Sequence, residues 1–595
     1  MMKKLLTAAT LSILIVHVTC AQQTTPGHSL GNAKSFAEKF INAIEKAERR
    51  MVSVALPNSK TVDVKVNVNN STGDDYHIIG GVEGYPHSTI FFDGNDQKIT
   101  GKIILINTKE AYSINTDDKG EVVITPTDIT KIIGWDEYDF SKEQVAQGDK
   151  GEYTSEEIIN AGKKMVIPQH ESMPGAVGIL YMDFDGEVST SRWNGGQTIN
   201  AVALNWEAQN PTYITNAWKI TAEDYAPYQV NVTTIRARYD NAPKDQRMMC
   251  IYTTTKTAAP QFGGVAYINS FTDAYDDPCW AFFSQEFKGE AETGSHEFGH
   301  AVNLNHDGGS SNPSYYLGHG SWGPIMGASY GPTKRPISQF SKGEYEGATN
   351  SSEDDMERMR VCIKAGYKVD DHSNVITGAT KLVTNGSGAV DSLKNTGIIE
   401  KRTDKDIFVF TTTGGDVKLD INSANDFLDH PNLDVQARLL DDKGTEILLS
   451  DPAGLKANIT KTLAAGTYYI EVDGVGFANP LNTGYSDYGS LGYFDISGTY
   501  PEGTVSSVII NDIKDGIEVY PNPINDIVSI IFTSARNNEV NEVIVTNVLG
   551  EVIYSNNSIS EAKISIDLHN QSNGIYFVRV KSGDQISAKK IVLSK

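Results

Sequence analysis

Residues 296–307 read HEFGHAVNLNHD, and this stretch carries the strongest chemical pattern in the chain. An α-helix turns by about 100° per residue, so His296 and His300 fall on one helical face. His306 can join them only if the helix stops and the chain turns back. A hydrolytic zinc ion takes three protein ligands and keeps a position open for water. The spacing therefore predicts zinc bound by His296, His300 and His306, against the alternative of an amphipathic helix with incidental histidines.

Length and charge bound the class of protein around this stretch. A chain of 595 residues is too long for one hydrophobic core, so several domains are expected. The composition, 39% hydrophobic and 21% charged, is that of a globular protein. The net charge of −24 argues against nucleic-acid binding and favours a well-solvated extracellular surface.

The N-terminal residues 1–20 contain two lysines followed by an apolar run of signal-peptide length. That run is too short for a membrane span, and no later segment is apolar enough to be one. We therefore expect export and no transmembrane segment after signal removal. Lipidation of Cys20 is the alternative, although Val-Thr-Cys is a poor lipidation motif.

Three cysteines remain in the mature chain, namely Cys250, Cys279 and Cys362. Export permits a disulfide. Cys250 and Cys279 both precede the histidine segment and are the candidate pair. Because the number is odd, at least one thiol is unpaired or bonded elsewhere.

The hydrophobic pattern changes several times along the chain. Helical periodicity covers residues 30–50, and short alternating strands follow from about 60 to 135. A buried strand is expected at 175–186, a helix and then a strand at 214–234, and two more strands in RMMCIYTTT and GGVAYINSF. The histidine helix is expected over 290–303. Two all-β stretches follow at 385–500 and 517–595.

The domain boundaries we predict are a signal peptide 1–20, a propeptide 21–170, a zinc domain 171–372, a β-sandwich 373–503 and a sorting domain 504–595.

The histidine segment resembles the metzincin zinc motif HExxHxxGxxH, with Asn303 in place of the glycine. That glycine lets the chain leave the helix with positive φ, and Asn tolerates this conformation best after Gly. Asp307 after the third histidine resembles the reprolysin (adamalysin-like) branch. The resemblance implies an α+β catalytic domain in which Glu297 is the general base and zinc-bound water is the nucleophile.

Two further features belong to the same resemblance. SWGPIMGASYGP (321–332) is similar to the methionine turn of metzincins, with Met326 in the central role. A tyrosine zinc ligand, found in some metzincins, is not carried over because Ala328 stands at its position. Tyr315, Tyr316 and Tyr330 are candidates for the specificity pocket.

The strand before the zinc helix is, in metzincins, an exposed edge that pairs with extended substrate. GGVAYINS (263–270) resembles it in position, which makes Gly264, Val265, Ala266 and Tyr267 the candidate substrate strand. An ordinary core strand is the alternative.

The segment 80–114 resembles reprolysin-type propeptides, which are β-rich and cover the cleft until they are removed. No cysteine lies between Ala21 and Met249, so a cysteine cannot block the metal. Latency would have to use a carboxylate, a histidine or steric cover. We expect the active form to begin near residues 165–176.

The C-terminal modules carry two more resemblances. Residues 385–500 are similar to the bacterial pre-peptidase C-terminal domain, a β-sandwich with either a binding role or a spacer role. Residues 517–595 resemble the type A sorting domain of the type IX secretion system, through VYPNPINDIVSI and the terminal KKIVLSK. This implies export across an outer membrane by the type IX machinery of a Bacteroidetes-type bacterium.

Calcium is a second candidate cofactor. Asp183 and Asp185 in YMDFDG could hold it, although a turn at a strand end is the competing interpretation. Asp404 and Asp406, near the start of the β-sandwich, form the other candidate pair.

These observations predict a multidomain, secreted or surface-located zinc endopeptidase made as a zymogen. An α+β metzincin-type domain would be followed by two all-β sandwich domains and preceded by a β-rich propeptide, with a protein or peptide as substrate. Two alternatives stay open: a surface adhesin or glycan-binding protein with a vestigial protease module, and a zinc hydrolase acting on a non-peptide bond.

Overall fold

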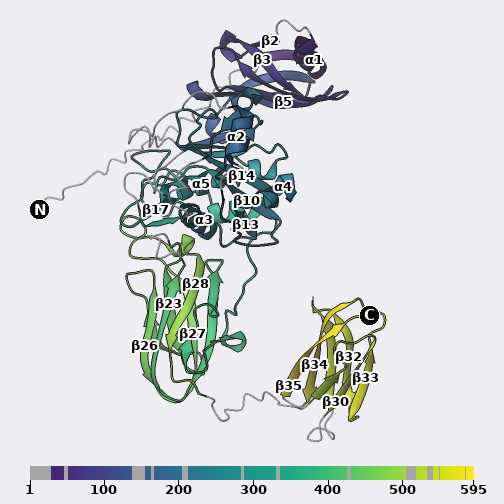
Figure 1. Cartoon of the computed structure of the whole chain (residues 1–595), viewed down its shortest axis with the longest axis vertical. Coiled ribbons are helices and arrows are strands. Elements are labelled where there is room, and N and C mark those ends of the chain that lie inside the picture. Colours follow the sequence, from purple (N-terminus) through teal and green to yellow (C-terminus); the bar gives the residue numbers. More distant parts are fainter. Residues whose placement is uncertain are drawn as a thin grey trace, which may run out of the picture. The chain divides into compact units, whose positions relative to one another are not determined.

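The structure is a computed structural model of the whole chain. It describes residues 28–45, 51–136, 154–162, 166–203, 212–282, 287–329, 335–424, 431–503, 517–532, 541–548, 550–582 and 585–595. The predicted signal peptide lies outside these ranges. The chain divides into two compact units, residues 1–503 and 504–595, which are drawn in Figure 1 and described separately below.

The N-terminal region forms an eight-stranded antiparallel sheet in the order β1-β8-β7-β6-β5-β4-β3-β2. In β3, TVDVKVNVN, apolar residues alternate with polar ones, so one face is buried and the other is solvated. Helix α1 (Ala33–Glu45) packs Phe36 and Phe40 against Phe92 of β5. The strands are β1 (His28–Asn32), β2 (Met51–Ala55), β3 (Thr61–Asn69), β4 (Asp75–Val82), β5 (Thr89–Asn95), β6 (Ile99–Leu105), β7 (Glu110–Thr116) and β8 (Glu121–Thr127).

A six-stranded mixed sheet, in the order β13-β10-β14-β16-β15-β9, forms the middle of the first unit. The first four strands run parallel, while β15 is antiparallel to both β16 and β9. All six residues of β10 are buried, as expected for a strand covered on both faces. The strands are β9 (Ile133–Asp136), β10 (Gly178–Asp183), β13 (Val230–Thr233), β14 (Arg247–Thr253), β15 (Gly264–Tyr267) and β16 (Cys279–Phe282).

Helices cover this sheet (Figure 1). Helix α5 (Phe287–Ala301) packs on β14, β15 and β16 and against α3 (Tyr213–Asp224), while α4 (Arg236–Asn241) packs on β10 and β14. Helices α2 (Ser155–Gly162) and α6 (Asp355–Cys362) complete the region. Two small sheets pair β11 (Glu187–Ser189) with β12 (Ile199–Ala201) and β17 (Trp322–Pro324) with β18 (Ile337–Gln339).

Two further sheets, built from residues 380–499, follow in the same unit. Their orders are β19-β22-β27-β24-β25 and β20-β28-β23-β26, with β21 paired to β28. The strands are β19 (Thr380–Lys381), β20 (Ala389–Val390), β21 (Thr396–Ile399), β22 (Lys405–Thr412), β23 (Gly415–Ser423), β24 (Val435–Leu440), β25 (Glu446–Ser450), β26 (Ala457–Leu463), β27 (Gly466–Gly474) and β28 (Gly492–Thr499).

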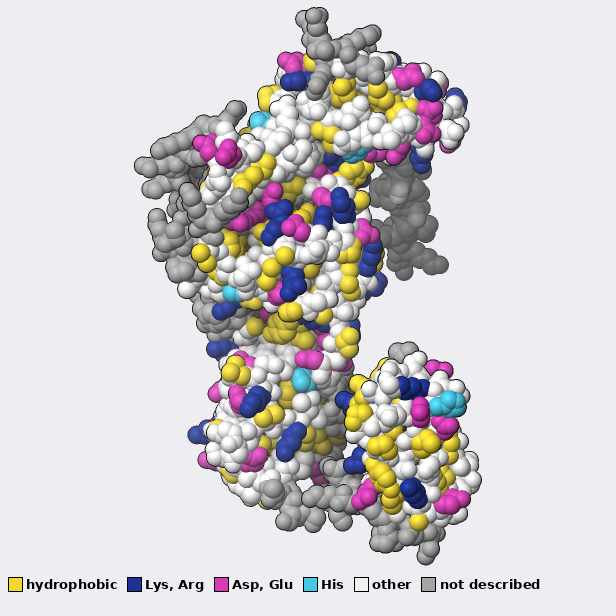
Figure 2. Space-filling view, turned by 45° about the vertical axis from the view of Figure 1, so that its right-hand side comes forward, with side chains coloured by type: hydrophobic (Ala, Val, Ile, Leu, Met, Phe, Trp, Pro, Cys, Tyr) yellow, Lys and Arg dark blue, Asp and Glu magenta, His cyan; other side chains and the backbone are white. Residues whose placement is uncertain are grey.

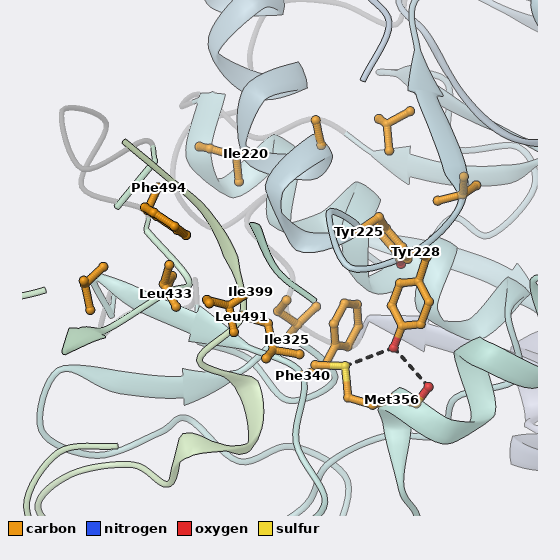
Figure 3. Close-up of a cluster of buried hydrophobic side chains, with 14 of the residues drawn as sticks. Ile220, Tyr225, Tyr228, Ile325, Phe340, Met356, Ile399, Leu433, Leu491 and Phe494 are labelled. Atoms are coloured by element: carbon orange, nitrogen blue, oxygen red, sulfur yellow. Dashed lines mark hydrogen bonds between the residues drawn. The ribbon is translucent and has the colours of Figure 1, made fainter. Parts of the chain in front are cut away.

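One hydrophobic core runs without interruption from the mixed sheet into these two sheets. Figure 3 shows Ile220 and Phe340 in the same cluster as Leu433 and Phe494. In that cluster the Tyr228 hydroxyl donates to the carbonyl of Met356 at 3.0 Å. The two regions are therefore joined by buried side chains as well as by the chain itself.

The second unit holds a three-stranded sheet, β29-β30-β33, and a four-stranded sheet, β32-β31-β34-β35. The strands are β29 (Ile517–Tyr520), β30 (Ile527–Phe532), β31 (Asn541–Asn547), β32 (Val552–Ile559), β33 (Lys563–Asp567), β34 (Gly574–Ser582) and β35 (Gln585–Leu593). A single apolar cluster from both sheets forms its core.

Most of the expected elements are present, and the differences are local. The histidine helix starts three residues earlier than predicted and ends at Ala301. The candidate disulfide is wrong: Cys250 and Cys279 lie opposite each other on neighbouring parallel strands as buried free thiols. The Cys279 thiol instead donates to the carbonyl of Met249 at 3.5 Å.

The surface mixes charge types. On the face displayed in Figure 2, acidic side chains alternate with basic and apolar ones. Among the described residues, no helix has both the length and the apolar character needed to cross a membrane.

Candidate metal centre

The third histidine is brought to the first two by a turn at Asn303. Helix α5 ends at Ala301, and Asn303 has a φ of 78°, the left-handed conformation expected from its place in the motif. The N–H of Asn303 donates to the carbonyl of His300 at 2.9 Å, which closes the turn. The chain then reverses and places His306 beside His300.

The three imidazoles meet at one point. One ring nitrogen from each of His296, His300 and His306 lies within 4.8 Å of the other two. The Nε2 atoms of His300 and His306 are 3.0 Å apart. Tetrahedral zinc at about 2.0–2.1 Å from each nitrogen would separate two ligands by about 3.3 Å, so the spacing fits this ion with little adjustment.

Backbone carbonyls orient two of the rings. Nδ1 of His296 donates to the carbonyl of Ile325 at 2.8 Å, and Nδ1 of His300 donates to the carbonyl of Leu304 at 2.8 Å. A hydrogen bond of this kind fixes the tautomer and assigns Nε2 to the metal. Burial lowers the pKa of His296 to about 4, and burial also lowers the pKa values of His300 and His306. Neutral imidazoles are the form that binds a metal ion.

Glu297 lies beside the histidines and is fully buried. Neither of its carboxylate oxygens has a hydrogen-bond partner among the described residues. Burial raises the pKa of Glu297, and the nearby charge of Asp136 raises it further. A Cβ built on Gly264 would overlap Oε1 of Glu297, so the carboxylate lies directly against the backbone of β15.

Met326 lies beneath the helix. It is fully buried, and a Cβ on Gly299 would overlap its sulfur, so helix and methionine are in close contact. Its carbonyl accepts a hydrogen bond from the N–H of Asp307 at 2.8 Å. The segment thus supports both ends of the motif, because the neighbouring Ile325 orients His296. The role of Met326 in a methionine turn under a metal stays a prediction.

The candidate substrate strand is not an exposed edge in this chain, because β9 of the N-terminal region pairs with it in antiparallel register. All four residues of β15 are buried, and binding of substrate along this strand once β9 is removed stays a prediction. Ala266 is opposite Gly134, and Gly264 is opposite Asp136. Nothing in the short IGWD sequence of β9 indicated this partner.

β9 passes directly in front of the histidines. A Cβ on Gly134 would overlap the ring of His300, so only a glycine allows this approach. The hydroxyl of Tyr315 donates to the carbonyl of Trp135 and lies 3.2 Å from Nε2 of His306. Tyr315 was predicted only as a pocket residue, and the structure adds this contact with both the strand and the third histidine.

The remaining candidates have varied positions. Tyr330 lies outside the described residues, and Tyr316 stacks on Tyr345. Asp183 is buried at the end of β10 with Asp185 two residues on. Among the described residues, no third potential ligand joins this pair in a metal-sized group, whereas Asp404 and Asp406 are brought together with Asp370.

Comparison with protein families identifies one part of the chain. Residues 518–594 match the model described as the secretion system C-terminal sorting domain. The second unit is a type IX sorting domain. The chain is therefore exported to the cell surface or the medium, and the sorting domain implies contact with the secretion machinery. The protease and pre-peptidase resemblances find no matching family model.

Other comparisons add little. No curated protein matches the chain. Similar solved structures include a beta-glucuronidase of an uncultured Clostridium sp., 11% identical over 32% of this chain and 34% of that chain, with a TM-score of 0.12. A biofilm-associated protein BSP domain is 11% identical over 36% of this chain and 52% of its own length, with a TM-score of 0.12. Dimeric latent PorU from Porphyromonas gingivalis is 14% identical over 34% and 20%, with a TM-score of 0.11. The chain spans about half or less of these proteins, and such TM-scores support no argument.

Proposed function

We propose that this protein is a secreted zinc endopeptidase, exported in a latent form. One observation carries the proposal: three neutral imidazoles and a buried carboxylate lie beside a strand that already pairs with an extended antiparallel segment. Hydrolysis of an extended peptide needs a strand for the peptide to pair with, a metal ion and a general base.

The residues present fit zinc. All three donors are imidazole nitrogens at zinc-like spacing, and carbonyls fix two of the rings. When bound, zinc would acidify a water molecule and polarise the scissile carbonyl. His296, His300 and His306 would hold the ion.

Glu297 supplies the proton transfer. Its carboxylate accepts a proton from the attacking water and passes it to the leaving amine. Burial without a hydrogen-bond partner among the described residues raises its proton affinity, which suits this exchange. The backbone of β15 would bind the substrate in the register now used by β9, so that the scissile bond lies near Glu297.

Latency follows from the same geometry. β9 pairs along all of β15 and its Gly134 lies against His300, so a substrate strand cannot bind while β9 remains. The predicted active form, starting near residues 165–176, lacks β9. The mechanism is steric cover by a strand, which is one of the options left open once a cysteine was excluded.

The first test concerns the metal. His306→Ala should lower the zinc content of the purified mature chain severely, because two imidazoles hold zinc far more weakly than three. Zinc is counted by inductively coupled plasma mass spectrometry. His319→Ala, which removes a histidine that bonds Tyr316 and Gly484 away from the cluster, is the matched control. Full occupancy in His306→Ala would show that the third ligand is misassigned.

The second test concerns the reaction. Glu297→Gln should keep its zinc and lose casein cleavage by about 10²–10⁴-fold, because the amide cannot accept the proton. Glu346→Gln, at an exposed position, is the control and should match the wild type. Unchanged casein cleavage in Glu297→Gln would refute the protease assignment. Activity on esters or sugars but not on peptides would favour the non-peptide hydrolase, and no activity on any of them would favour the adhesin.

A further inference from the structure

A second group of acidic side chains lies far from the histidines in sequence, where the chain enters the β-sandwich region. Carboxylate oxygens of Asp370, Asp404 and Asp406 lie within 4.8 Å of one another. Asp371 also offers a ligand atom within 4.8 Å of one from Asp406. Glu400, at the end of β21, adds its charge to the same group. The sequence pointed only to Asp404 and Asp406.

Three members of this cluster, Asp406, Asp404 and Glu400, are buried and have too few hydrogen-bond donors around them. Asp406 is fully buried, Asp404 is 3% exposed and Glu400 is 1% exposed. Among the described residues, four of their oxygens have no hydrogen-bond partner: both of Asp406, Oδ1 of Asp404 and Oε2 of Glu400. A buried carboxylate without a partner is costly, so the group must either bind protons or hold a cation.

Neighbouring cations do not supply the missing charge. Lys401 pairs with Oε1 of Glu400 at 3.0 Å, on the opposite oxygen from the one that lacks a partner. Lys405 points to Glu471 and Asp473 instead. His372 lies nearby, with Nε2 3.7 Å from Oδ2 of Asp371, but its two ring nitrogens bond Thr380 and the carbonyl of Thr396.

The other two members, Asp370 and Asp371, are exposed to solvent. An ion could enter past these two side chains and reach the buried oxygens below them. A Cβ on Gly397 of β21 would overlap Oδ2 of Asp406, so the carboxylate is confined against the backbone and keeps its place.

We propose that Asp370, Asp371, Glu400, Asp404 and Asp406 form a calcium site that ties the end of the mixed-sheet region to the β-sandwich region. Calcium takes six to eight oxygen ligands at about 2.3–2.6 Å, so two of its ligands can be up to about 5 Å apart. The ligand atoms of Asp370, Asp404 and Asp406 lie within 4.8 Å of one another, close enough to share one such ion. Magnesium demands near-ideal octahedral geometry and gives up its water reluctantly, so a cluster of protein carboxylates suits it less well.

The bound ion would link two segments. Asp370 and Asp371 follow α6, whereas Asp404 and Asp406 lie on or beside β22. Their charges repel one another without the ion. A bound ion would cross-link the segment after α6 to the start of β22 and so join the two regions. This role does not depend on the peptidase activity, because the cluster contains none of the histidines.

The test is calcium-dependent stability of the full mature chain. After treatment with EGTA, the melting temperature is measured against CaCl₂, with MgCl₂ in parallel, and bound calcium is counted by titration calorimetry. We expect the melting temperature to rise between about 0.1 and 1 mM calcium, the range of extracellular sites. Magnesium should give a smaller shift.

Variants assign the effect to this cluster. Asp406→Asn should abolish the calcium response and leave the calcium-free melting temperature equal to or above that of the wild type, since it removes a buried charge. Asp370→Asn, at an exposed position whose carboxylate also accepts hydrogen bonds from the N–H of His372 and the side-chain amide of Asn374, should weaken calcium binding. Asp442→Asn, in an exposed turn of the same region, is the control. A wild type that ignores calcium, an equal response to magnesium, or a full response in Asp406→Asn would each overturn the proposal.

Discussion

Single glycine and asparagine residues decide how closely backbone and side chains approach at the histidine cluster. Gly264 leaves room for the carboxylate of Glu297, Gly299 leaves room for the sulfur of Met326, and Asn303 adopts positive φ where the chain turns toward His306. None of these residues carries chemistry itself. Each fixes the position of a side chain that does.

Gly264→Ala tests the contact with Glu297. The added methyl group overlaps Oε1 and must push the carboxylate away from its place beside β15. We expect the zinc content to stay normal and kcat/KM for peptides to fall by about 10²-fold, because a misplaced base reacts slowly. Steady-state kinetics and metal analysis on the same preparation check this, with Gly454→Ala, at an exposed and open position of the β-sandwich region, as the control. Wild-type kinetics in Gly264→Ala would contradict the placement of Glu297.

Asn303 offers a test of the turn. Asn303→Gly should be tolerated or slightly stabilising, because glycine adopts a φ of 78° without strain. Asn303→Val should cost about 1–3 kcal/mol at this φ and displace His306. Zinc content and melting temperature distinguish the two variants. Equal zinc retention in both would mean that the turn does not control the third ligand.

Much of the histidine cluster could be predicted from the sequence. The spacing of HEFGHAVNLNHD predicted that His296, His300 and His306 converge, and the preference of Asn for the left-handed region predicted the turn at 303. Glycine contacts could not be predicted, because they depend on which strand lies opposite. Glu400, Asp370 and Asp371 were also missed, because the tertiary fold brings these loop residues to Asp404 and Asp406.

Pairing of β9 with β15 controls access to the histidine cluster. β15 presents its free edge only when β9 is absent, and β9 approaches through Gly134. Because β9 pairs with a strand more than a hundred residues away, no local sequence pattern predicts the pairing of β9 with β15.

Gly134→Val tests whether β9 provides the cover. The branched side chain cannot fit against His300, so β9 should leave the cleft and the unprocessed chain should gain activity. A peptide assay on purified, uncleaved protein measures this. Thr61→Val, an exposed residue on β3, is the control and should remain latent. Continued latency in Gly134→Val would argue that β9 is not the inhibitory element.

Helix α3 contacts the β-sandwich region through Glu223, which accepts a hydrogen bond from the N–H of Tyr493 in β28 at 3.0 Å. Burial raises the pKa of Glu223 to about 8, with a further rise from Asp224 and an opposing effect from Lys368. Because the folded-state pKa is the higher one, the folded protein holds a proton that the unfolded chain releases between about pH 4.5 and 8. Stability therefore falls as the pH rises through this window.

Glu223→Gln should remove that pH dependence while keeping a hydrogen-bond acceptor for Tyr493. We expect the melting temperature of the variant to equal that of the wild type near pH 4.5 and to exceed it increasingly toward pH 8. Thermal melts across this range check the sign. A variant that is less stable than the wild type at pH 8 would show that Glu223 is ionised and paired in the folded protein.

The whole molecule combines one large unit and a separate sorting domain. The shared core in Figure 3 means that residues 171–372 alone would expose Ile220, Phe340 and other side chains that pack against Leu433 and Phe494. By contrast, residues 504–595 have their own core. The sequence predicted both boundaries from changes in pattern, but pattern alone could not show which one is spanned by buried side chains.

Truncation tests this difference. A chain ending at Gly503 should keep the melting temperature and zinc content of the first unit, whereas a chain ending at His372 should be insoluble or strongly destabilised. Light scattering and thermal melts on both chains provide the measurement. A soluble, fully stable chain ending at His372 would mean that the shared core contributes little.

Hydrolysis of peptide bonds at the histidine cluster can be measured by incubating the mature chain with a mixed peptide pool and identifying new N-termini by mass spectrometry, with Glu297→Gln in parallel. We expect cleavage at internal peptide bonds that stops on zinc removal, returns on zinc addition and is absent in Glu297→Gln. An intact pool with zinc-loaded wild type, or the same cleavage pattern from Glu297→Gln, would contradict the proposed peptidase function.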